Sequence, residues 1–523
     1  MATIAIYDST LRDGAQAQGV SYSVEDKLKI VALLDDLGIG YIEAGNPGSN
    51  PKDLEFFARL GELQLKTAKI IAFGATRKVG VSVADDANLQ FLLQAGTTAI
   101  AIFGKSWDYQ VREILRTTLD ENLLMIADTI SYLKRHGREV VFDAEHFFDG
   151  YKANPDYALA TLKAAADAGA DSLCLCDTNG GSLPLDILEI TRVVVGRFKT
   201  TIGIHCHNDS ELAVANSLMA VEAGATQVQG TINGIGERCG NANLIAIIPD
   251  LQLKLGHDCI PAPLMAQLTS VARCVAEIAN MTPNEKAAYV GKHAFAHKGG
   301  MHIDAVSKNP AAYEHVDPDT VGNQRFILMS EVAGRSTLLA KVKRIDPSLE
   351  RDSPQLVTLM EKLKALEHEG YQFESAESSF ELVVRKLLGR HQPFFTLREF
   401  KVMVNEPAVH GVNSSAMIKI RVGDMEEITA AEGDGPVNAL DMALRKALER
   451  FYPAIKEIKL TDYKVRVLDS DQASAAKVRV LIESTDHRER WTTIGVSTDV
   501  IDASWRALVD AIEYKLLRDQ ERN

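Results

Sequence analysis

The stretch Thr201-Ile202-Gly203-Ile204-His205-Cys206-His207-Asn208-Asp209 decides how the rest of the chain is interpreted. Its apolar, β-branched beginning favours a strand, and its two histidines stand two positions apart. In a strand that spacing places both imidazoles on one face. Two neutral imidazoles side by side are an efficient start to a divalent metal site. The alternative is structural: one histidine caps the following helix while the other packs.

Composition narrows the class of protein. At 523 residues, 46% hydrophobic and 24% charged, the chain is long enough for about two to four globular domains. A net charge of −14 argues against nucleic-acid binding, and no apolar run approaches the roughly 20 residues of a membrane span. Six cysteines are too few for a disulfide framework. The chain enters a strand-like run at once, without a secretory signal, so we expect a cytoplasmic enzyme with reduced thiols.

Short apolar runs alternate with amphipathic helical stretches such as Val24–Leu37 and Tyr157–Ala168. Several of these stretches close with a glycine, the usual helix terminator. Strands alternating with helices imply parallel crossovers, and eight units in about 250 residues predict an α/β fold with a (β/α)₈ TIM barrel over residues 1–280. A doubly wound open sheet is the alternative. The predicted strands are Ile4–Tyr7, Tyr41–Ala44, Ile70–Phe73, Ala99–Phe103, Val140–Asp143, Ser172–Cys176, Ile202–His205 and Gln227–Thr231.

Polar residues follow the predicted strands, which is where a barrel carries its reactive side chains. The run Gly234–Gly240 is not a dinucleotide fingerprint, because its third glycine comes one position late and it follows the last strand. Cys174 and Cys176 are expected to be small core residues, since a thiolate metal site needs more ligands. The polar segments are 8–16, Glu43, 143–145, 177–179, 205–209 and 233–241.

Three motifs carry a resemblance to a known family. The chain resembles the Claisen-condensing acyltransferases, which include the 2-isopropylmalate, homocitrate and citramalate synthases, and segments 143–150 and 207–213 are most similar to the longer-chain citramalate synthase branch. It departs from the family at Ala15, where many members have glutamate, and at Ser210-Glu211, which leaves the keto-acid preference open. The motifs are Asp8-Ser9-Thr10-Leu11-Arg12-Asp13-Gly14, His205-Cys206-His207-Asn208-Asp209 and Gly236-Glu237-Arg238-Cys239-Gly240-Asn241.

The resemblance implies that Asp13, His205, His207 and Asn241 are metal ligands. Two imidazole nitrogens, a carboxylate and an amide oxygen also suit Mn²⁺, Mg²⁺ or Zn²⁺ on chemical grounds alone. An incomplete shell of protein ligands leaves positions for a 2-oxo acid. A divalent ion there would act on the bound ketone as a Lewis acid.

Other side chains near these motifs are candidates for binding substrate. Arg12 is predicted to be catalytic, because it brings a permanent positive charge near the ketone oxygen. Its alternative role is an ion pair with a barrel carboxylate such as Glu43. The resemblance implies that Thr178 hydrogen-bonds the keto-acid carboxylate. Gln16, Glu43 and Asp143 are further pocket-lining candidates.

Two residues are candidates for the base that takes a proton from the acetyl thioester methyl group. Glu145 is one, since a desolvated carboxylate becomes more basic. His302 is the other, in the stretch His297–Asp304. The resemblance implies that His302 enters the barrel of the neighbouring subunit and that Tyr313 is its catalytic companion. The sequence does not decide between Glu145 and His302.

Residues 281–395 are predicted to form helical linker subdomains, with helices at Val357–His368 and Ala376–Leu388. Residues 396–523 contain an internal repeat of three alternating strands and a helix, which predicts a pseudo-symmetric α+β domain. This domain resembles the regulatory domain of the same synthases, which implies that it binds an end-product amino acid, isoleucine for citramalate synthases. The carboxylate would sit at the helix N-termini after Gly433 and Gly495. A dimerisation module without a ligand is the alternative.

The resemblance as a whole implies a homodimeric, metal-dependent acyltransferase of isoleucine and branched-chain amino-acid biosynthesis. Acetyl-CoA condenses with pyruvate, and hydrolysis of the thioester gives (R)-citramalate and CoA. One alternative is a 2-isopropylmalate synthase, with 2-oxoisovalerate as the acceptor. Alternatives of another class are a metal-dependent C–C lyase, against which the long C-terminal repeat argues, and a non-catalytic amino-acid sensor.

Overall fold

The computed structural model describes residues 2–49, 51–327, 342–343, 345–347, 349–350, 353–373, 376–409, 412–468, 476–486 and 489–522. The chain divides into two compact units. The first comprises residues 1–295 and 314–325, and the second comprises residues 296–313 and 326–523. Across the described ranges, no helix has both the length and the apolar character needed to cross a membrane.

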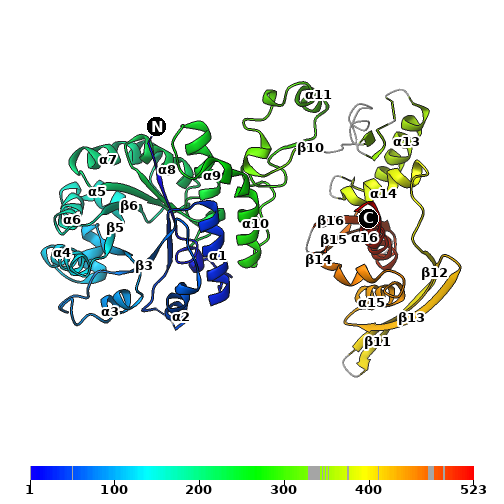
Figure 1. The fold of residues 1–523 in the computed structure, drawn as a ribbon, viewed down its shortest axis with the longest axis horizontal. Helices are drawn as coiled ribbons and strands as arrows, with labels where there is room; N and C mark the ends of the chain where they lie inside the picture. The colour runs from blue at the N-terminus through cyan, green and yellow to red at the C-terminus, as the bar shows by residue number, and fades with distance from the viewer. Residues whose placement is uncertain are drawn as a thin grey trace. The chain divides into compact units, whose positions relative to one another are not determined.

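Eight parallel strands close into a barrel in the first unit, in chain order, with the first strand paired to the last (Figure 1). The predicted (β/α)₈ barrel is confirmed, and the open doubly wound sheet is wrong. Each predicted strand is present with ends shifted by at most two residues. The strands are β1 (Ala5–Asp8), β2 (Tyr41–Gly45), β3 (Lys69–Ala75), β4 (Ala99–Lys105), β5 (Glu139–Glu145), β6 (Ser172–Asp177), β7 (Thr201–Cys206) and β8 (Gln227–Gly230).

Helices surround the strands of the barrel (Figure 1). Helix α1 shows how local sequence sets their ends: Ser23 and Asp26 form a reciprocal capping box at its start, and Gly38 adopts a left-handed conformation at its end. Their apolar faces pack against the outer faces of the strands in one continuous core. The helices are α1 (Val24–Leu37), α2 (Pro51–Arg59), α3 (Ala87–Gln94), α4 (Leu119–Arg135), α5 (Phe147–Ala153), α6 (Pro155–Asp167), α7 (Pro184–Arg197), α8 (Ala213–Glu222), α9 (Leu244–Pro249) and α10 (Leu268–Ile278).

The barrel interior is filled by side chains. Tyr7, Ile71, Val141 and Cys174 form part of this inner cluster, and each is buried. A filled interior confines ligand binding to the rim at the carboxyl ends of the strands.

The segment that follows β8 turns back tightly over the barrel rim. The Thr231 N–H donates to the Ala242 carbonyl at 3.0 Å, and the Asn241 N–H donates to the Gly234 carbonyl at 3.1 Å. A Cβ atom on Gly230 would lie 2.3 Å from the Ala242 oxygen, and one on Gly236 would lie 1.9 Å from Asn241 Oδ1. Real atoms never approach so closely, so these glycines permit the packing that fixes Asn241.

The helices of the second unit before its C-terminal repeats include α11 (Gly300–Lys308), α13 (Pro354–Glu369) and α14 (Glu377–Leu387). The two helices predicted over 357–368 and 376–388 are therefore present. A short parallel pair, β9 (Ala296–His297) with β10 (Phe326–Ile327), was not predicted.

The C-terminal part of this unit consists of two βββα repeats, as predicted. Each repeat is a three-stranded antiparallel sheet followed by a helix. Both helices contribute to one shared core with the two sheets, and α14 packs against the second repeat. The elements are β11 (Thr396–Val409), β12 (Val412–Val422), β13 (Met425–Gly433), α15 (Pro436–Leu448), β14 (Lys459–Val467), β15 (Val478–Thr485), β16 (Arg490–Ser497) and α16 (Val500–Arg522).

Substitution of Gly230 by alanine is expected to destabilise the barrel by about 1–3 kcal/mol, because the new methyl group collides with backbone rather than with a movable side chain. Gly196→Ala is the matched control. Gly196 lies in exposed α7 with open space around it, so alanine there should stabilise by about 0.5–1 kcal/mol. The melting temperatures of Gly230→Ala and Gly196→Ala are to be compared with that of the unaltered protein. Equal melting temperatures of the two variants would contradict the steric argument.

Candidate metal centre and active site

Four side chains predicted as ligands meet at the barrel rim. Asp13 lies in the loop after β1, His205 is in β7, and His207 directly follows β7. Asn241 lies in the segment after β8 and pairs with His207 through an isolated antiparallel bridge. All four residues are buried. They come from three neighbouring strands because β8 lies between β7 and β1 in the closed sheet.

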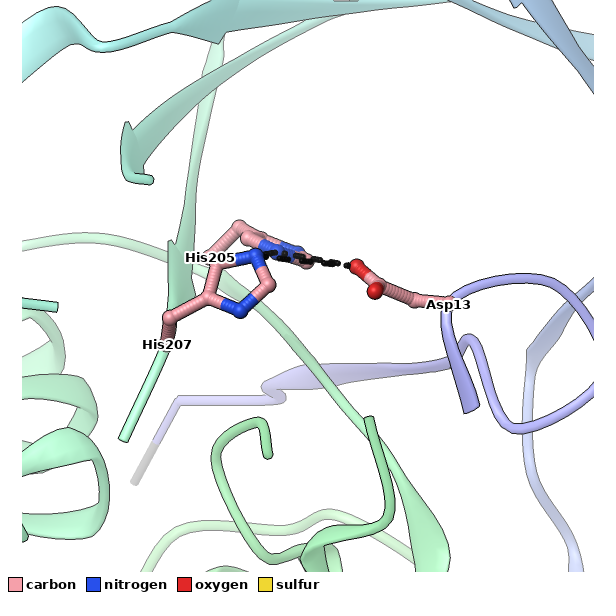
Figure 2. A group of neighbouring side chains, drawn as sticks. All are labelled: Asp13, His205 and His207. Carbon is pink, nitrogen blue, oxygen red and sulfur yellow. Dashed lines mark hydrogen bonds and ion pairs between the residues drawn. The ribbon is translucent and has the colours of Figure 1, made fainter. Parts of the chain in front are cut away.

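Asp13 and the two histidines point toward one another (Figure 2). Asp13 Oδ2 lies 3.4 Å from His205 Nε2 and 3.8 Å from His207 Nε2, and the two Nε2 atoms are 3.4 Å apart. This group of ligand atoms is compact enough to hold one metal ion. Asn241 Nδ2 donates to Asp13 Oδ2 at 3.0 Å, whereas Asn241 Oδ1 has no hydrogen-bond partner within the described ranges.

The electrostatics of the cluster favour an ionised carboxylate beside neutral imidazoles. Burial by itself would raise the pKa of Asp13, but Arg12 and the two histidines hold that pKa well below its usual range. Burial lowers the pKa of His205, and burial together with the neighbouring imidazole lowers the pKa of His207 to about 4. Neutral imidazole and ionised carboxylate are the protonation states that bind metal.

Arg12 makes the contact to Glu43 that the sequence suggested as one of its two roles, and it also contacts Asp13. Its guanidinium forms an ion pair with Glu43, and its Nη1 lies 3.2 Å from Asp13 Oδ2. Burial works against the charge, but Glu43 and Asp13 raise the pKa of Arg12. The guanidinium carbon also lies 3.9 Å from the centre of the Phe73 ring, which stacks on Phe103 at a centroid distance of 5.3 Å.

Glu43 is fully buried, and both of its oxygens are occupied. Tyr7 donates to Oε2 at 2.5 Å, Ser9 donates to Oε1 at 2.6 Å, and Arg12 donates to the same Oε1. Glu43 therefore supports Arg12 from below the rim.

Asp143 is buried inside the barrel, two residues before the end of β5. Its Oδ1 accepts a hydrogen bond of 2.9 Å from Gln229 Nε2, and burial followed by the nearby Glu43 charge raises its pKa to about 7. Cys174 and Cys176 lie close enough to Asp143 to form a second possible ligand group. Burial raises the pKa of the Cys174 thiol well above its usual range, which disfavours a thiolate site and fits the predicted core role.

Gln229 is the residue that sequence reasoning missed. Its carboxamide connects Asp143 to His205, whose Nδ1 lies 3.0 Å from Gln229 Oε1. The available signal was its position: in β8, the alternation Gln227-Val228-Gln229 places two amides on the inner face of a barrel strand.

Three other predicted residues lie around the same rim. Thr178 follows β6, and its Oγ1 accepts the His146 N–H at 2.8 Å. Glu145 ends β5 and forms an ion pair of 2.5 Å with Lys105. Gln16 is exposed in the loop that carries Asp13.

Arg238 holds the neighbouring loops together. It forms a two-pronged ion pair with Asp209, at 2.8 and 2.9 Å, and donates to the Thr178 carbonyl at 2.6 Å. Loops that follow β6, β7 and β8 are thereby tied to one another beside the ligand cluster.

His302 and Tyr313 belong to the second unit, so they are not part of the barrel unit that carries the ligand cluster. Their rings stack at a centroid distance of 4.1 Å. The structure therefore brings His302 and Tyr313 together within the segment 296–313.

Comparison with known proteins covers the entire chain. Residues 3–275 match the HMGL-like family, residues 289–370 match the homocitrate synthase post-HMGL domain-like family, and residues 374–516 match the LeuA allosteric (dimerisation) domain. The first match alone spans more than half of the chain.

Relatives that match over the full length identify the group within this family. The chain is 52% identical to an (R)-citramalate synthase of Geobacter sulfurreducens, over 100% of this chain and 99% of the relative. It is 54% identical to an (R)-citramalate synthase of Aquifex aeolicus, over 99% and 98% of the two chains. A 2-isopropylmalate synthase of Methanocaldococcus jannaschii is 32% identical over 99% and 96%. The chain therefore belongs to the HMGL-like family and, within it, to the (R)-citramalate synthases.

Proposed function

We propose that this chain condenses acetyl-CoA with pyruvate and hydrolyses the thioester, giving (R)-citramalate and CoA for isoleucine biosynthesis. The observation that carries this function is the full-length identity of 52% and 54% to (R)-citramalate synthases. The 32% identity to a 2-isopropylmalate synthase makes 2-oxoisovalerate the less favoured acceptor. An intact ligand cluster argues against a sensor without catalysis.

The cluster fits a divalent cation. Asp13, His205 and His207 supply the mixed nitrogen and oxygen donors that suit Mn²⁺, Mg²⁺ or Zn²⁺. The unpartnered Asn241 Oδ1 supports a fourth donor, since a flip of the terminal amide exchanges its nitrogen and oxygen ends. A divalent cation bound here supplies Lewis acidity toward the ketone of pyruvate.

Arg12 and Thr178 have complementary tasks in this proposal. Arg12 is held by Glu43 and keeps a permanent positive charge beside Asp13, where it stabilises negative charge that develops on the ketone oxygen. Thr178 uses its oxygen to accept the His146 N–H, which leaves its hydroxyl proton free to bind the pyruvate carboxylate. Gln16 lies exposed at the same rim, in the segment after β1 that also carries Asp13.

The acetyl methyl group must lose a proton to Glu145 or to the His302–Tyr313 pair. Glu145 stands at the rim and is oriented by Lys105. His302 is oriented by its ring contact with Tyr313. The match to a dimerisation domain supports a homodimer, in which His302 and Tyr313 act on the barrel of the partner chain.

Feedback control by isoleucine is part of the same proposal. The C-terminal repeats match an allosteric domain. The N-cap residue of helix α15 is Gly435, which has no side chain to cap the helix. The N-terminal N–H groups of α15 can therefore receive a carboxylate. At α16, Asp499 Oδ1 already accepts the Ile501 N–H at 2.8 Å. The α15 terminus is therefore the better candidate of the two.

A CoA-release assay with four acceptors tests the function. Pyruvate should give the highest kcat/KM, at least about tenfold above 2-oxoisovalerate, because the latter carries two more carbons and a difference of even one methylene is worth about 10–200-fold. 2-Oxobutyrate and 2-oxoglutarate complete the series, and chiral analysis of the product checks for (R)-citramalate. A preference for 2-oxoisovalerate would identify a 2-isopropylmalate synthase, and no CoA release with any acid would leave an amino-acid sensor.

Substitutions at the two candidate bases separate their roles. Loss of the general base should lower kcat by about 10²–10⁴-fold, so Glu145→Gln and His302→Ala are to be compared, with acetyl-CoA methyl exchange into D₂O as a direct readout. Glu139→Gln is the matched control, because Glu139 lies at the opposite end of β5. Full turnover in both test variants would mean that neither residue is the base.

Isoleucine is expected to inhibit CoA release by the full chain more strongly than leucine or valine does. Gly435→Asp should abolish this inhibition with basal activity unchanged, because the new carboxylate caps α15 and repels the effector carboxylate. A side chain at position 435 meets no neighbouring atom. Gly61→Asp, at an exposed position after α2 with open space for a Cβ atom, adds the same charge elsewhere as a control. Equal inhibition of the two variants would exclude the α15 terminus.

A further inference from the structure

Gln229 lies between a ligand of the proposed metal centre and a buried carboxyl group. It is fully buried in β8, and its register partner across the β7–β8 ladder is His205. Its Oε1 lies 3.0 Å from His205 Nδ1, and its Nε2 donates to Asp143 Oδ1 at 2.9 Å. One carboxamide thus joins β7, β8 and β5 inside the barrel.

The direction of the carboxamide follows from its partners. An amide nitrogen only donates and an amide oxygen only accepts. An ionised Asp143 can only accept a hydrogen bond, so this contact keeps the donating Nε2 of Gln229 on its side. Oε1 must then face His205, and His205 Nδ1 must carry the proton of that hydrogen bond.

This hydrogen bond selects one tautomer of His205. A neutral imidazole carries a single proton, so a proton on Nδ1 leaves the lone pair on Nε2. Nε2 is the atom that faces Asp13 Oδ2 at 3.4 Å and His207 Nε2 at 3.4 Å. The lone pair therefore points at the position where a cation would bind.

We propose that Gln229 is a positioning residue of the metal centre, which holds His205 in the Nδ1–H tautomer through a hydrogen-bonded chain anchored at Asp143. The inference rests on the metal site of the proposed function. It assigns Asp143 to supporting the ligands from within the barrel rather than to contacting substrate. Hydrogen bonds that orient a metal-binding histidine typically contribute 10–100-fold to metal affinity, so the expected effect is of about that size.

His205 and His207 differ in whether the Nδ1 atom has a hydrogen-bond partner. His207 Nδ1 is buried and makes no hydrogen bond to any residue that the structure describes. His205 is held by the hydrogen-bonded chain that runs through Gln229 to Asp143. The anchored ligand is therefore His205, and Gln229 is the position at which to test the anchor.

Mn²⁺ titration of the metal-free full-length protein, followed by electron paramagnetic resonance, is the test. Gln229→Met removes both hydrogen bonds at similar volume and should weaken Mn²⁺ binding about 10–100-fold. Gln229→Glu keeps an acceptor for His205 and, because two adjacent carboxyl groups share a proton, can keep a donor to Asp143. It should therefore stay within about threefold of the unaltered protein. Gln227→Met is the matched control, because Gln227 is buried on the same face of β8 and its amide contacts Ser172 instead.

The outcomes distinguish a failure of the Gln229 proposal from a failure of the proposed metal site itself. Weak binding confined to Gln229→Met, with a metal-free melting temperature equal to that of Gln227→Met, supports the positioning role. Unchanged affinity in Gln229→Met, or equal losses in Gln229→Glu and Gln229→Met, would overturn it while leaving the metal site intact. An unaltered protein that binds no Mn²⁺ would overturn both.

Discussion

The pairing of β1 with β8 is the constraint on which the site depends. All strands of the barrel run in one direction, so their carboxyl ends share one rim, but only closure makes the first and last strands neighbours. Asp13 and Asn241 are 228 positions apart in the chain and still form a hydrogen bond of 3.0 Å. In an open sheet with the same strand order, these two residues would lie at opposite edges. The electrostatics of Asp13, His205 and His207 follow from that closure.

Much of this arrangement could be predicted from local sequence. Apolar runs ending in polar residues located the eight strands, and the histidine spacing in β7 located the centre of the cluster. The environment of each side chain was harder to predict, because it depends on register. Gln227 and Gln229 occupy equivalent inward positions in β8, yet one contacts Ser172 and the other contacts His205 and Asp143. For Arg12 the sequence suggested a place near the ketone oxygen or an ion pair with Glu43. The folded chain shows the Glu43 pair together with an Asp13 contact that was not predicted.

Neither compact unit is one continuous segment of the chain. The segment 296–313 belongs with the C-terminal unit, whereas 314–325 returns to the barrel unit, where Glu314 and Arg325 form an ion pair of 2.5 Å. Both segments are short, so hydrophobic periodicity did not indicate the exchange. The pairing of β9 with β10 joins residues on either side of that return. Such two-residue strands are too short to have a periodicity of their own.

The stacked rings of Phe73 and Phe103 bear on laboratory evolution of the acceptor pocket. They stand on β3 and β4, whereas every ligand of the proposed metal centre comes from β1, β7 or β8 and the segments after them. Volume can therefore be altered on that side of the rim without moving an ion-binding group. Phe73 lies directly beneath the Arg12 guanidinium and Phe103 is one ring further away. A saturation library that varies the volume on this side of the rim is best started at Phe103.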